Sequence, residues 1–303
     1  MFHWISRVKA SLVGAVTGAG IGLLAFFSLT SQQYPGMGAT LFILVPIGAG
    51  FAVGMVSKRS DAGFAIALLS LLASLVLLIS LRREGLLCAI LAFPILLAGL
   101  LIGVGLAALA RRFILPCSRN QTTTLGMLLL LAPTLVLVGE RLETPSLKRP
   151  RIEIVENSVQ IGRSPEAVWN SILSIDSLHA SKPILMYVGL PIPQRCEMVG
   201  KGVGAKRTCF FDVGSIEETI TEWNPPFKMG LLIDRAHMPG RHWLAFESAQ
   251  YELQAQASST TLKRTTVVTS YLRPAWYWRF FERWGVESEH RYILNDLAMQ
   301  AKR

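Results

Sequence analysis

Two histidines are the side chains of this chain best suited to acid–base chemistry. His242 lies in the segment GRHWLAF, and His290 lies near the C-terminus, three residues after Glu287. An imidazole titrates near neutral pH, so either histidine could donate or accept a proton in a reaction. Residues three apart on a helix lie on one flank, so Glu287 could interact with His290. The alternative at both positions is a histidine that is packed in the core or exposed on the surface.

The sequence favours neither a metal site nor a phosphate-binding loop. His237 and His242 are five residues apart, but no Cys or carboxylate joins them at the spacing of zinc ligands. The glycines of GKGVGAKRT differ in spacing from the loop G-x-x-x-x-G-K-[ST], and strand-forming residues follow where that loop needs a helix. We therefore predict no cofactor. We predict a β-hairpin instead, ended by WNPP at residues 223–226 because proline cannot donate to a sheet ladder.

The C-terminal half contains the elements that would position these residues. A strand is predicted over residues 151–161, and a helix follows Ser164, which suits an N-cap, with Pro165 in the first turn. Apolar and polar residues alternate over residues 249–257, which predicts a strand with one buried face, and another strand follows the turn at residues 258–260.

A long helix is predicted over residues 274–301. Its apolar stripe comprises Tyr277, Phe281, Trp284, Leu294 and Leu297. We expect an α+β fold in which an antiparallel sheet wraps around this helix. Such a sheet leaves room for an apolar ligand between itself and the helix.

Residues from about 152 to 301 resemble the SRPBCC, or START-like, superfamily, in the branch known as polyketide cyclase/dehydrase. The resemblance rests on SPEAVWNSI, on GVGAKRTCFFDVGSIEETITEW, and on RTTVVTSYLRPAWYW leading to EHRYIL in the final helix. It implies a helix-grip fold around a deep hydrophobic cavity. Members of the superfamily bind lipids, sterols, polyketides or other apolar molecules, and some catalyse cyclisation or dehydration in the cavity.

The resemblance also draws attention to Arg207, Cys209 and Glu218, because this branch tends to carry the same residue types there. A buried Arg207–Glu218 pair on neighbouring strands could orient the polar end of a ligand or hold a carboxylate. The alternative is a pair that only fixes strand register or faces solvent. Two aromatic residues complete the ligand-binding candidates. Tyr271 could direct its hydroxyl at a ligand or a neighbouring strand, and Trp284 could line a cavity mouth, pack in the core or lie at a membrane interface.

The overall composition favours a membrane as a partner and disfavours nucleic acid. The chain is 51% hydrophobic and only 17% charged, with a net charge of +10. Residues 1–147 carry ten Lys/Arg against four Asp/Glu, and the remaining residues carry twenty against sixteen. The basic residues of the first half flank apolar runs, and those of the second half are interspersed with acids, so neither forms a basic stripe. We expect an anionic membrane surface to be the partner of this excess charge.

Five uncharged runs of about 20 residues or more are each long enough to cross a bilayer as a helix. They are residues 10–30, 38–57, 62–81, 85–110 and 120–139. The fifth begins with NQTTT, so a buried or interfacial helix is the alternative there. We predict an all-α transmembrane bundle over residues 1–139 in the cytoplasmic (inner) membrane. A linker over residues 140–150 and the helix-grip domain over residues 151–303 follow.

Basic residues favour the cytoplasmic side of a membrane, so the number of spans decides on which side the C-terminal domain lies. With a cytoplasmic N-terminus, five spans place this domain outside the membrane and four place it in the cytoplasm. The runs contain no Asp, Glu, Lys, Arg or His, which argues against a transporter or proton pump. Glycines recur every four residues at Gly14/Gly18/Gly22, Gly50/Gly54 and Gly99/Gly103. This spacing favours close helix packing or self-association, although glycine is common in membrane helices.

Cys196 and Cys209 could pair if the domain were exported. Two cysteines do not form a disulfide framework, however, so we expect free thiols.

The leading interpretation is a membrane-anchored domain that binds a hydrophobic small molecule or lipid. One alternative is a cyclase or dehydrase that uses His242, His290, Arg207 or Glu218 as acid–base groups. Another is a regulatory or assembly module that docks a partner protein without a ligand.

Overall fold

A computed structural model describes residues 16, 19–20, 22–24, 26–27, 38–56, 60–81, 85–113, 134, 136–173, 175–238 and 244–300. The chain divides into two compact units. The helical unit comprises Met1–Arg149 together with Tyr271–Ala275, and the sheet unit comprises Pro150–Ser270 and Trp276–Arg303.

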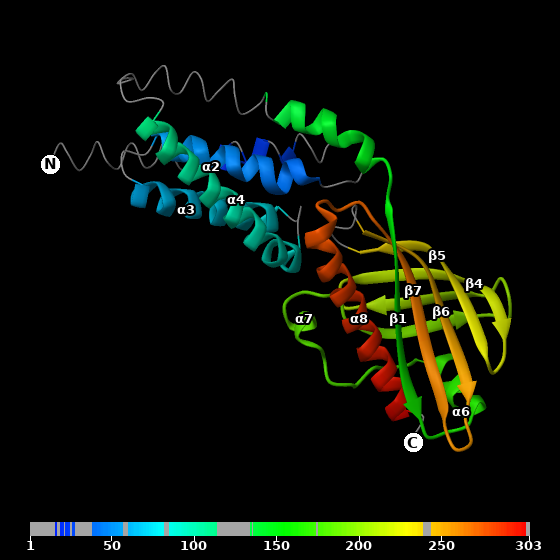
Figure 1. Ribbon diagram of the computed structural model, residues 1–303. Helices are drawn as coiled ribbons and strands as arrows, with labels where there is room; N and C mark the ends of the chain where they lie inside the picture. The colour runs from blue at the N-terminus through cyan, green and yellow to red at the C-terminus, as the bar shows by residue number, and fades with distance from the viewer. Residues whose placement is uncertain are drawn as a thin grey trace. The chain divides into compact units, whose positions relative to one another are not determined.

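The described part of the helical unit follows the middle three apolar runs. The π-helical turn η1 (Thr40–Leu44) continues into α2 (Val45–Val56), and α3 (Ser60–Ser80) and α4 (Leu86–Phe113) follow (Figure 1). The runs at residues 10–30 and 120–139 fall largely outside the described residues. Residues 136–147 are helical, so most of the segment predicted as a linker continues a helix. From this helix, the Glu143 carboxylate accepts hydrogen bonds from the backbone N–H groups of Ala39 and Thr40 at the start of η1.

Glycines allow α2 and α4 to approach each other closely. A Cβ added at Gly50 would lie 2.2 Å from the carbonyl oxygen of Leu100, and one added at Gly103 would lie 2.1 Å from that of Ile47. The other glycine of each pair is equally crowded: a Cβ added at Gly54 would have an atom at 2.6 Å, and one added at Gly99 would have an atom at 2.8 Å. The close helix packing predicted from these two glycine spacings is therefore present.

Two of the described helices are long and apolar enough to cross a membrane. They are the segments Gly63–Ser80 in α3 and Leu86–Arg112 in α4, while the apolar helix Thr40–Met55 is shorter. A buried helix of a water-soluble protein satisfies the same criterion. The described residues thus supply two qualifying helices in place of the five predicted, and the multi-pass bundle stays a prediction.

The sheet unit is a seven-stranded antiparallel sheet with the strand order β1-β7-β6-β5-β4-β3-β2. Its strands are β1 (Arg151–Ile161), β2 (Pro193–Val199), β3 (Lys206–Phe211), β4 (Gly214–Asn224), β5 (Lys228–His237), β6 (Leu244–Ala255) and β7 (Thr260–Ser270). Its helices are α6 (Pro165–Leu173), α7 (Ile184–Tyr187) and the long α8 (Ala275–Gln300), which lies along the sheet in Figure 1. The curved antiparallel sheet with one long C-terminal helix fits the predicted helix-grip fold.

The hairpin predicted around GVGAK is confirmed. Gly200, Gly202 and Gly204 precede β3 with φ angles of 85°, 90° and 87°, a conformation that favours glycine. These glycines form the loop that joins β2 to β3, and a strand follows them where a phosphate loop requires a helix. β4 ends at Asn224, directly before the Pro225–Pro226 pair, as the lack of proline N–H groups predicts.

The buried face of α8 differs from the predicted stripe. The side chains that the sheet covers include Trp278, Glu282, Val286 and His290, whereas Tyr277, Phe281 and Trp284 are only partly buried. The predicted Leu294 and Leu297 are buried in the main apolar core. Because charged residues occupy part of the covered face, hydrophobicity alone identifies the wrong side of the first half of this helix.

Candidate functional site

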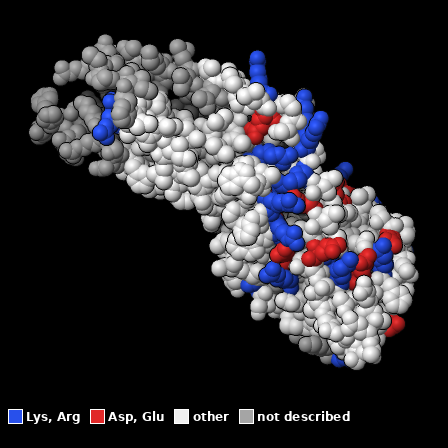
Figure 2. Space-filling model, viewed as in Figure 1, with Lys and Arg blue, Asp and Glu red and all other residues white. Residues whose placement is uncertain are grey.

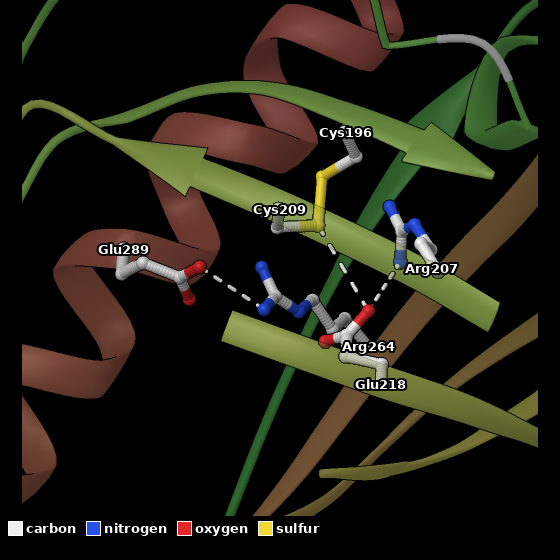
Figure 3. The surroundings of a disulfide bond; sticks show 6 residues. All are labelled: Cys196, Arg207, Cys209, Glu218, Arg264 and Glu289. Carbon is white, nitrogen blue, oxygen red and sulfur yellow. Dashed lines mark hydrogen bonds and ion pairs between the residues drawn. A yellow bond between two sulfur atoms is a disulfide. The ribbon is translucent and has the colours of Figure 1, made fainter. Parts of the chain in front are cut away.

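Charged side chains gather on the face of the sheet that α8 covers (Figure 3). Arg207 on β3 is directly opposite Glu218 on β4, and Tyr251 on β6 is directly opposite Arg264 on β7. Residues that pair directly across antiparallel strands emerge on the same face. We call Arg207, Glu218, Tyr251, Arg264 and Glu289 of α8 the interior polar cluster.

Arg207 and Glu218 form the first ion pair of this cluster. Arg207 Nη1 donates to Glu218 Oε2 at 3.2 Å, and the two residues are only 3% and 6% exposed. The residues thus form a buried pair across neighbouring strands, and the alternative in which the pair faces solvent is wrong. Removing two charges from water opposes their mutual attraction, so a pair this buried adds little net stability.

Arg264 and Glu289 form the second ion pair, which the sequence analysis missed. Arg264 Nη2 lies 3.0 Å from Glu289 Oε1, and their side chains are 10% and 17% exposed. Burial raises the pKa of the Glu289 carboxyl above its usual value, against the opposing effect of the Arg264 charge. Burial, the largest single effect, would lower the pKa of Arg264, but the interactions with Glu289, Tyr251 and Glu218 together outweigh it and the pKa rises overall.

Tyr251 brings the two pairs together. The guanidinium carbon of Arg264 lies 5.5 Å from the Tyr251 ring centroid, and that of Arg207 lies 5.8 Å from it. Both distances are within the range of cation–π attraction. The ring itself is almost fully buried. The cluster therefore joins two cations and two carboxylates around one aromatic ring, with a net charge of zero when all four are ionised.

One member of the cluster has unused hydrogen-bonding capacity. Nε and Nη1 of Arg264 are buried and have no hydrogen-bond partner among the residues that the structure describes. Buried polar groups in folded proteins are nearly always hydrogen-bonded. These donors can therefore accommodate an acceptor that the described part of the chain does not provide.

A disulfide lies beside the cluster. Cys196 on β2 and Cys209 on β3 are directly opposite each other, with Cα atoms 4.0 Å apart, and their sulfurs are bonded. The Cys209 sulfur lies 3.9 Å from Glu218 Oε2 (Figure 3). The expectation of free thiols was therefore wrong. It rested on the number of cysteines, while the pairing depends on strand register, which the sequence alone does not show.

His290 is fully buried and uses both ring nitrogens. Nδ1 lies 3.0 Å from Asn157 Oδ1 on β1, and Nε2 lies 2.7 Å from Thr266 Oγ1 on β7. Since an amide oxygen only accepts, Nδ1 donates to Asn157, and Nε2 accepts from the Thr266 hydroxyl. Burial, and secondly the charge of Arg264, lower the pKa of His290 to about 2. A neutral imidazole with both nitrogens engaged joins α8 to the sheet, and this geometry does not favour acid–base chemistry.

The other predicted site residues have contacts with residues outside this cluster, belong to the helical unit or lie outside the described residues. Glu287 does not contact His290 as expected, but pairs with Arg283 and Arg291 at 2.8 and 3.0 Å on its own helix. Trp284 lies against Phe280, with ring centroids 6.2 Å apart. The two remaining candidates are Tyr271, which belongs to the helical unit, and His242, which lies outside the described residues.

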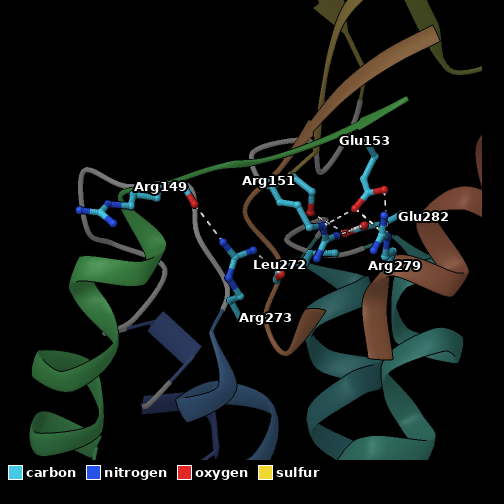
Figure 4. A network of polar contacts seen from close by, with 8 residues as sticks. Arg149, Arg151, Glu153, Leu272, Arg273, Arg279 and Glu282 are labelled. Atoms are coloured by element: carbon cyan, nitrogen blue, oxygen red, sulfur yellow. Dashed lines mark hydrogen bonds and ion pairs between the residues drawn. The ribbon is translucent and has the colours of Figure 1, made fainter. Parts of the chain in front are cut away.

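A second network ties the first turns of α8 to the sheet (Figure 4). Glu282 is buried, pairs with Arg151 of β1, and accepts a hydrogen bond from Ser270 of β7 at 2.5 Å. Burial raises the pKa of Glu282. Glu153 extends the network by pairing with Arg151 and Arg279. These contacts join α8 to β1 and β7, so the network positions the helix on the sheet.

The helical unit has a polar contact of its own in the same figure. Arg273 Nη2 donates to the carbonyl oxygen of Arg149 at 2.9 Å (Figure 4). This bond joins the segment Tyr271–Ala275 to the last turn before the sheet unit begins.

The described residues include no group of three or more His, Cys, Asp or Glu side chains that could hold a metal ion. The interior polar cluster is therefore the candidate site that the described residues support best. Two signals in the sequence could have revealed more of it. Arg264 lies in phase with Leu262 and Thr266 in the alternating strand TLKRTTVV, which places it on the buried face. The position of Tyr251 on its buried strand face was predicted, but its contact with two arginines was not.

No family model matches the sequence, and no curated protein matches it. Similar solved structures cover half of this chain. The Zhui aromatase/cyclase from Streptomyces sp. R1128 has 17% identity and a TM-score of 0.37, over 50% of this chain and 95% of its own. A START superfamily protein from Mycobacterium smegmatis has 9% identity and a TM-score of 0.37, over 49% and 97%. Norcoclaurine synthase from Thalictrum flavum has 9% identity and a TM-score of 0.35, over 50% and 88%. At these identities and scores the similarities carry no statement about activity.

Proposed function

We propose that the sheet unit binds an apolar small molecule or lipid between its sheet and α8, with the polar end of the ligand at the interior polar cluster. We further propose that the apolar helices of the other unit anchor the protein in a membrane.

The observation that carries the ligand proposal is the pair of buried ion pairs around Tyr251. Replacing buried ion pairs with apolar side chains of similar volume is often neutral or stabilising, so stability alone does not account for them. Binding sites for apolar ligands combine a mainly apolar lining with a few well-placed polar groups. Arg207, Glu218 and Arg264 are such groups on the sheet face that also carries the apolar core residues Leu231 and Leu262, and Glu289 of α8 is a fourth.

The membrane proposal is supported by the outward-facing side chains of α3 and α4. Val76, Ile102 and Leu109 are more than half exposed although their helices are apolar on every side. A helix that is hydrophobic all round is normally buried in protein or in lipid. Figure 2 shows hardly any charged atoms over the described part of these helices, whereas both signs of charge intermingle on the sheet unit.

The ligand proposal is tested on the full chain purified in a mild detergent. Bound molecules are extracted and identified by mass spectrometry, and binding of the neutral fluorescent dye Nile red is titrated in the presence and absence of the extract. We expect a co-purifying apolar molecule that displaces the dye. The variant Tyr251→Ala should weaken this binding, and Trp276→Ala on the exposed start of α8 should not. Absence of any retained molecule and of saturable dye binding would overturn the proposal.

The membrane proposal has an independent test. Membranes from expressing cells are washed with alkaline carbonate, which removes peripheral proteins, and the chain is traced by immunoblot. Retention in the washed membrane is expected, and release into the supernatant would show that the apolar helices pack inside a water-soluble protein.

One observation favours a cyclase or dehydrase as the second function. The Glu289 carboxyl has a raised pKa because of burial and lies beside the Arg264 guanidinium. A carboxyl that keeps its proton can act as a general acid, and a neighbouring cation can stabilise a developing enolate oxygen. In this case Glu289→Gln would abolish turnover of an apolar polycarbonyl substrate while its affinity changes little. The hydrogen bonds at both ring nitrogens of His290 argue against giving it the acid–base role.

A further inference from the structure

We infer that Arg264 is the residue that selects the ligand, and that the ligand is an apolar molecule with a carboxylate at one end. This inference rests on the ligand binding proposed above and specifies its chemistry. The evidence is the position of Arg264 between Glu289 and Tyr251, together with its two nitrogens that have no partner among the described residues.

Arg264 has donors that the chain leaves unused. Its Nη2 faces Glu289, while Nε and Nη1 have no acceptor among the described residues, although the side chain is nine-tenths buried. A buried donor without an acceptor is destabilising, and a donor on a charged group more so. An oxygen acceptor on a ligand removes this penalty only when the ligand is bound. A carboxylate is the acceptor that an arginine binds most strongly, because charge attraction adds to the hydrogen bonds.

The surroundings of Arg264 limit where such an acceptor can come from. Tyr251 covers one side of the guanidinium, with 5.5 Å between the guanidinium carbon and the ring centroid. Asn157 of the neighbouring strand β1 lies directly opposite Arg264. The side-chain oxygen of Asn157, however, accepts a hydrogen bond from His290. Glu218 is held by Arg207. These neighbours leave Glu289 as the one described carboxylate that pairs with Arg264, and they do not satisfy Nε or Nη1.

The charge balance of the cluster is compatible with an added carboxylate. With Arg207, Glu218, Arg264 and Glu289 all ionised the cluster is neutral, so a ligand carboxylate would leave an excess negative charge. Burial raises the pKa of Glu289, which makes this carboxyl the member that takes up a proton when an anion enters. The ligand carboxylate then replaces the charge of Glu289 opposite Arg264.

The test compares two ligands that differ only at the head group. The full chain in neutral detergent is titrated with hexadecanoate or with hexadecanol, each competing with Nile red. We expect the wild-type chain to prefer the carboxylate by about tenfold or more, the contribution of hydrogen bonds to a charged group. The double variant Arg264→Met/Glu289→Leu removes both partners of the buried pair, so it avoids leaving an isolated charge. It should bind both ligands with equal affinity, because the carboxylate then has no cation of this pair to face.

Two further variants separate this role from a structural one. Glu289→Gln keeps the Arg264 charge but removes the competing carboxylate, so it should increase the preference for hexadecanoate. Arg291→Met removes one positive charge from the exposed side of α8 and should leave the preference unchanged. If Arg264 and Glu289 contribute only to stability, Glu289→Gln should leave the preference for hexadecanoate unchanged.

The outcomes distinguish the inference from the function on which it rests. If the wild-type chain binds both ligands equally, or if the double variant keeps the preference, the assignment of Arg264 is wrong while apolar ligand binding stands. If neither ligand displaces the dye and the dye itself does not bind, both are wrong.

Discussion

Cys196 and Cys209 face each other across β2 and β3, and their disulfide lies next to the carboxylate of Glu218. Disulfides form and persist in oxidising compartments and are rare in the cytoplasm. With the membrane anchoring proposed above, the bond predicts that the sheet unit faces the oxidising side of the membrane, which corresponds to an odd number of spans for a cytoplasmic N-terminus. Alkaline phosphatase fused to the C-terminus should be active, and maleimide-PEG should modify these cysteines only after reduction.

The same bond gives a prediction for stability. Cys196 and Cys209 are 13 residues apart, and closing a loop of this size contributes about 3 kcal/mol to the free energy of unfolding. The variant Cys196→Ser/Cys209→Ser should lose this amount in chemical denaturation. Dithiothreitol should weaken the wild-type chain similarly and leave the variant unaffected. An equal effect of the reductant on both proteins would contradict the pairing.

His290 predicts a dependence of stability on pH. Its pKa is lowered to about 2 in the folded protein by burial and by the Arg264 charge, while an unfolded histidine titrates near 6.5. Between these values the unfolded chain binds the additional proton, so the free energy of unfolding falls as pH is lowered below about 6.5. The slope for this single group is at most about 1.4 kcal/mol per pH unit.

The variant His290→Gln isolates this contribution. A glutamine amide can donate to Asn157 and accept from Thr266 but does not titrate. Glu282 and Glu289 have raised pKa values and act in the opposite direction, but they are present in both proteins and cancel in the comparison. Chemical denaturation from pH 4.5 to 7.5 should show wild type losing stability relative to the variant as the pH falls. Parallel profiles would show that His290 is not buried in its neutral form.

The buried pair Arg151–Glu282 should couple far more strongly than an exposed pair on the same helix. Removing one partner leaves the other charge buried without compensation, which typically costs about 3 to 5 kcal/mol. The exposed pair Arg283–Glu287 is the matched control and should contribute about 0.5 kcal/mol or less. Double-mutant cycles to alanine at both sites measure the two coupling energies. Equal couplings would show that Glu282 is accessible to water.

The sequence predicted those elements whose signals are local. Strand alternation identified the buried side of Tyr251 and Leu253, and Ser164 with Pro165 marked the start of α6. What it missed depends on contacts between distant segments. The disulfide follows from the β2–β3 register, and Glu289 meets Arg264 only when α8 lies across β7.

The misplaced stripe of α8 has a related cause. Hydrophobic periodicity assumes that the covered face of a helix is apolar. In α8 this face carries Glu282, Glu289 and His290, each of which has a polar partner on the sheet. The aromatic residues Tyr277, Phe281 and Trp284 dominated the periodicity although they lie on another side. Sequence patterns are therefore least reliable where buried polar groups replace apolar ones, which is also where the candidate site lies.

The glycines of α2 and α4 give the final prediction, which concerns the helical unit. Alanine at Gly103 would place its Cβ 2.1 Å from the Ile47 carbonyl oxygen, so the two helices would have to move apart. An added Cβ at Gly105, two residues along the same helix, meets no atom within 4 Å. Gly103→Ala should therefore lower the thermal stability of the full chain in detergent by about 2 kcal/mol or more. Gly105→Ala should be neutral or slightly stabilising, because alanine is the better helix former. A Gly103→Ala protein that melts like Gly105→Ala would show that α2 and α4 are not in close contact.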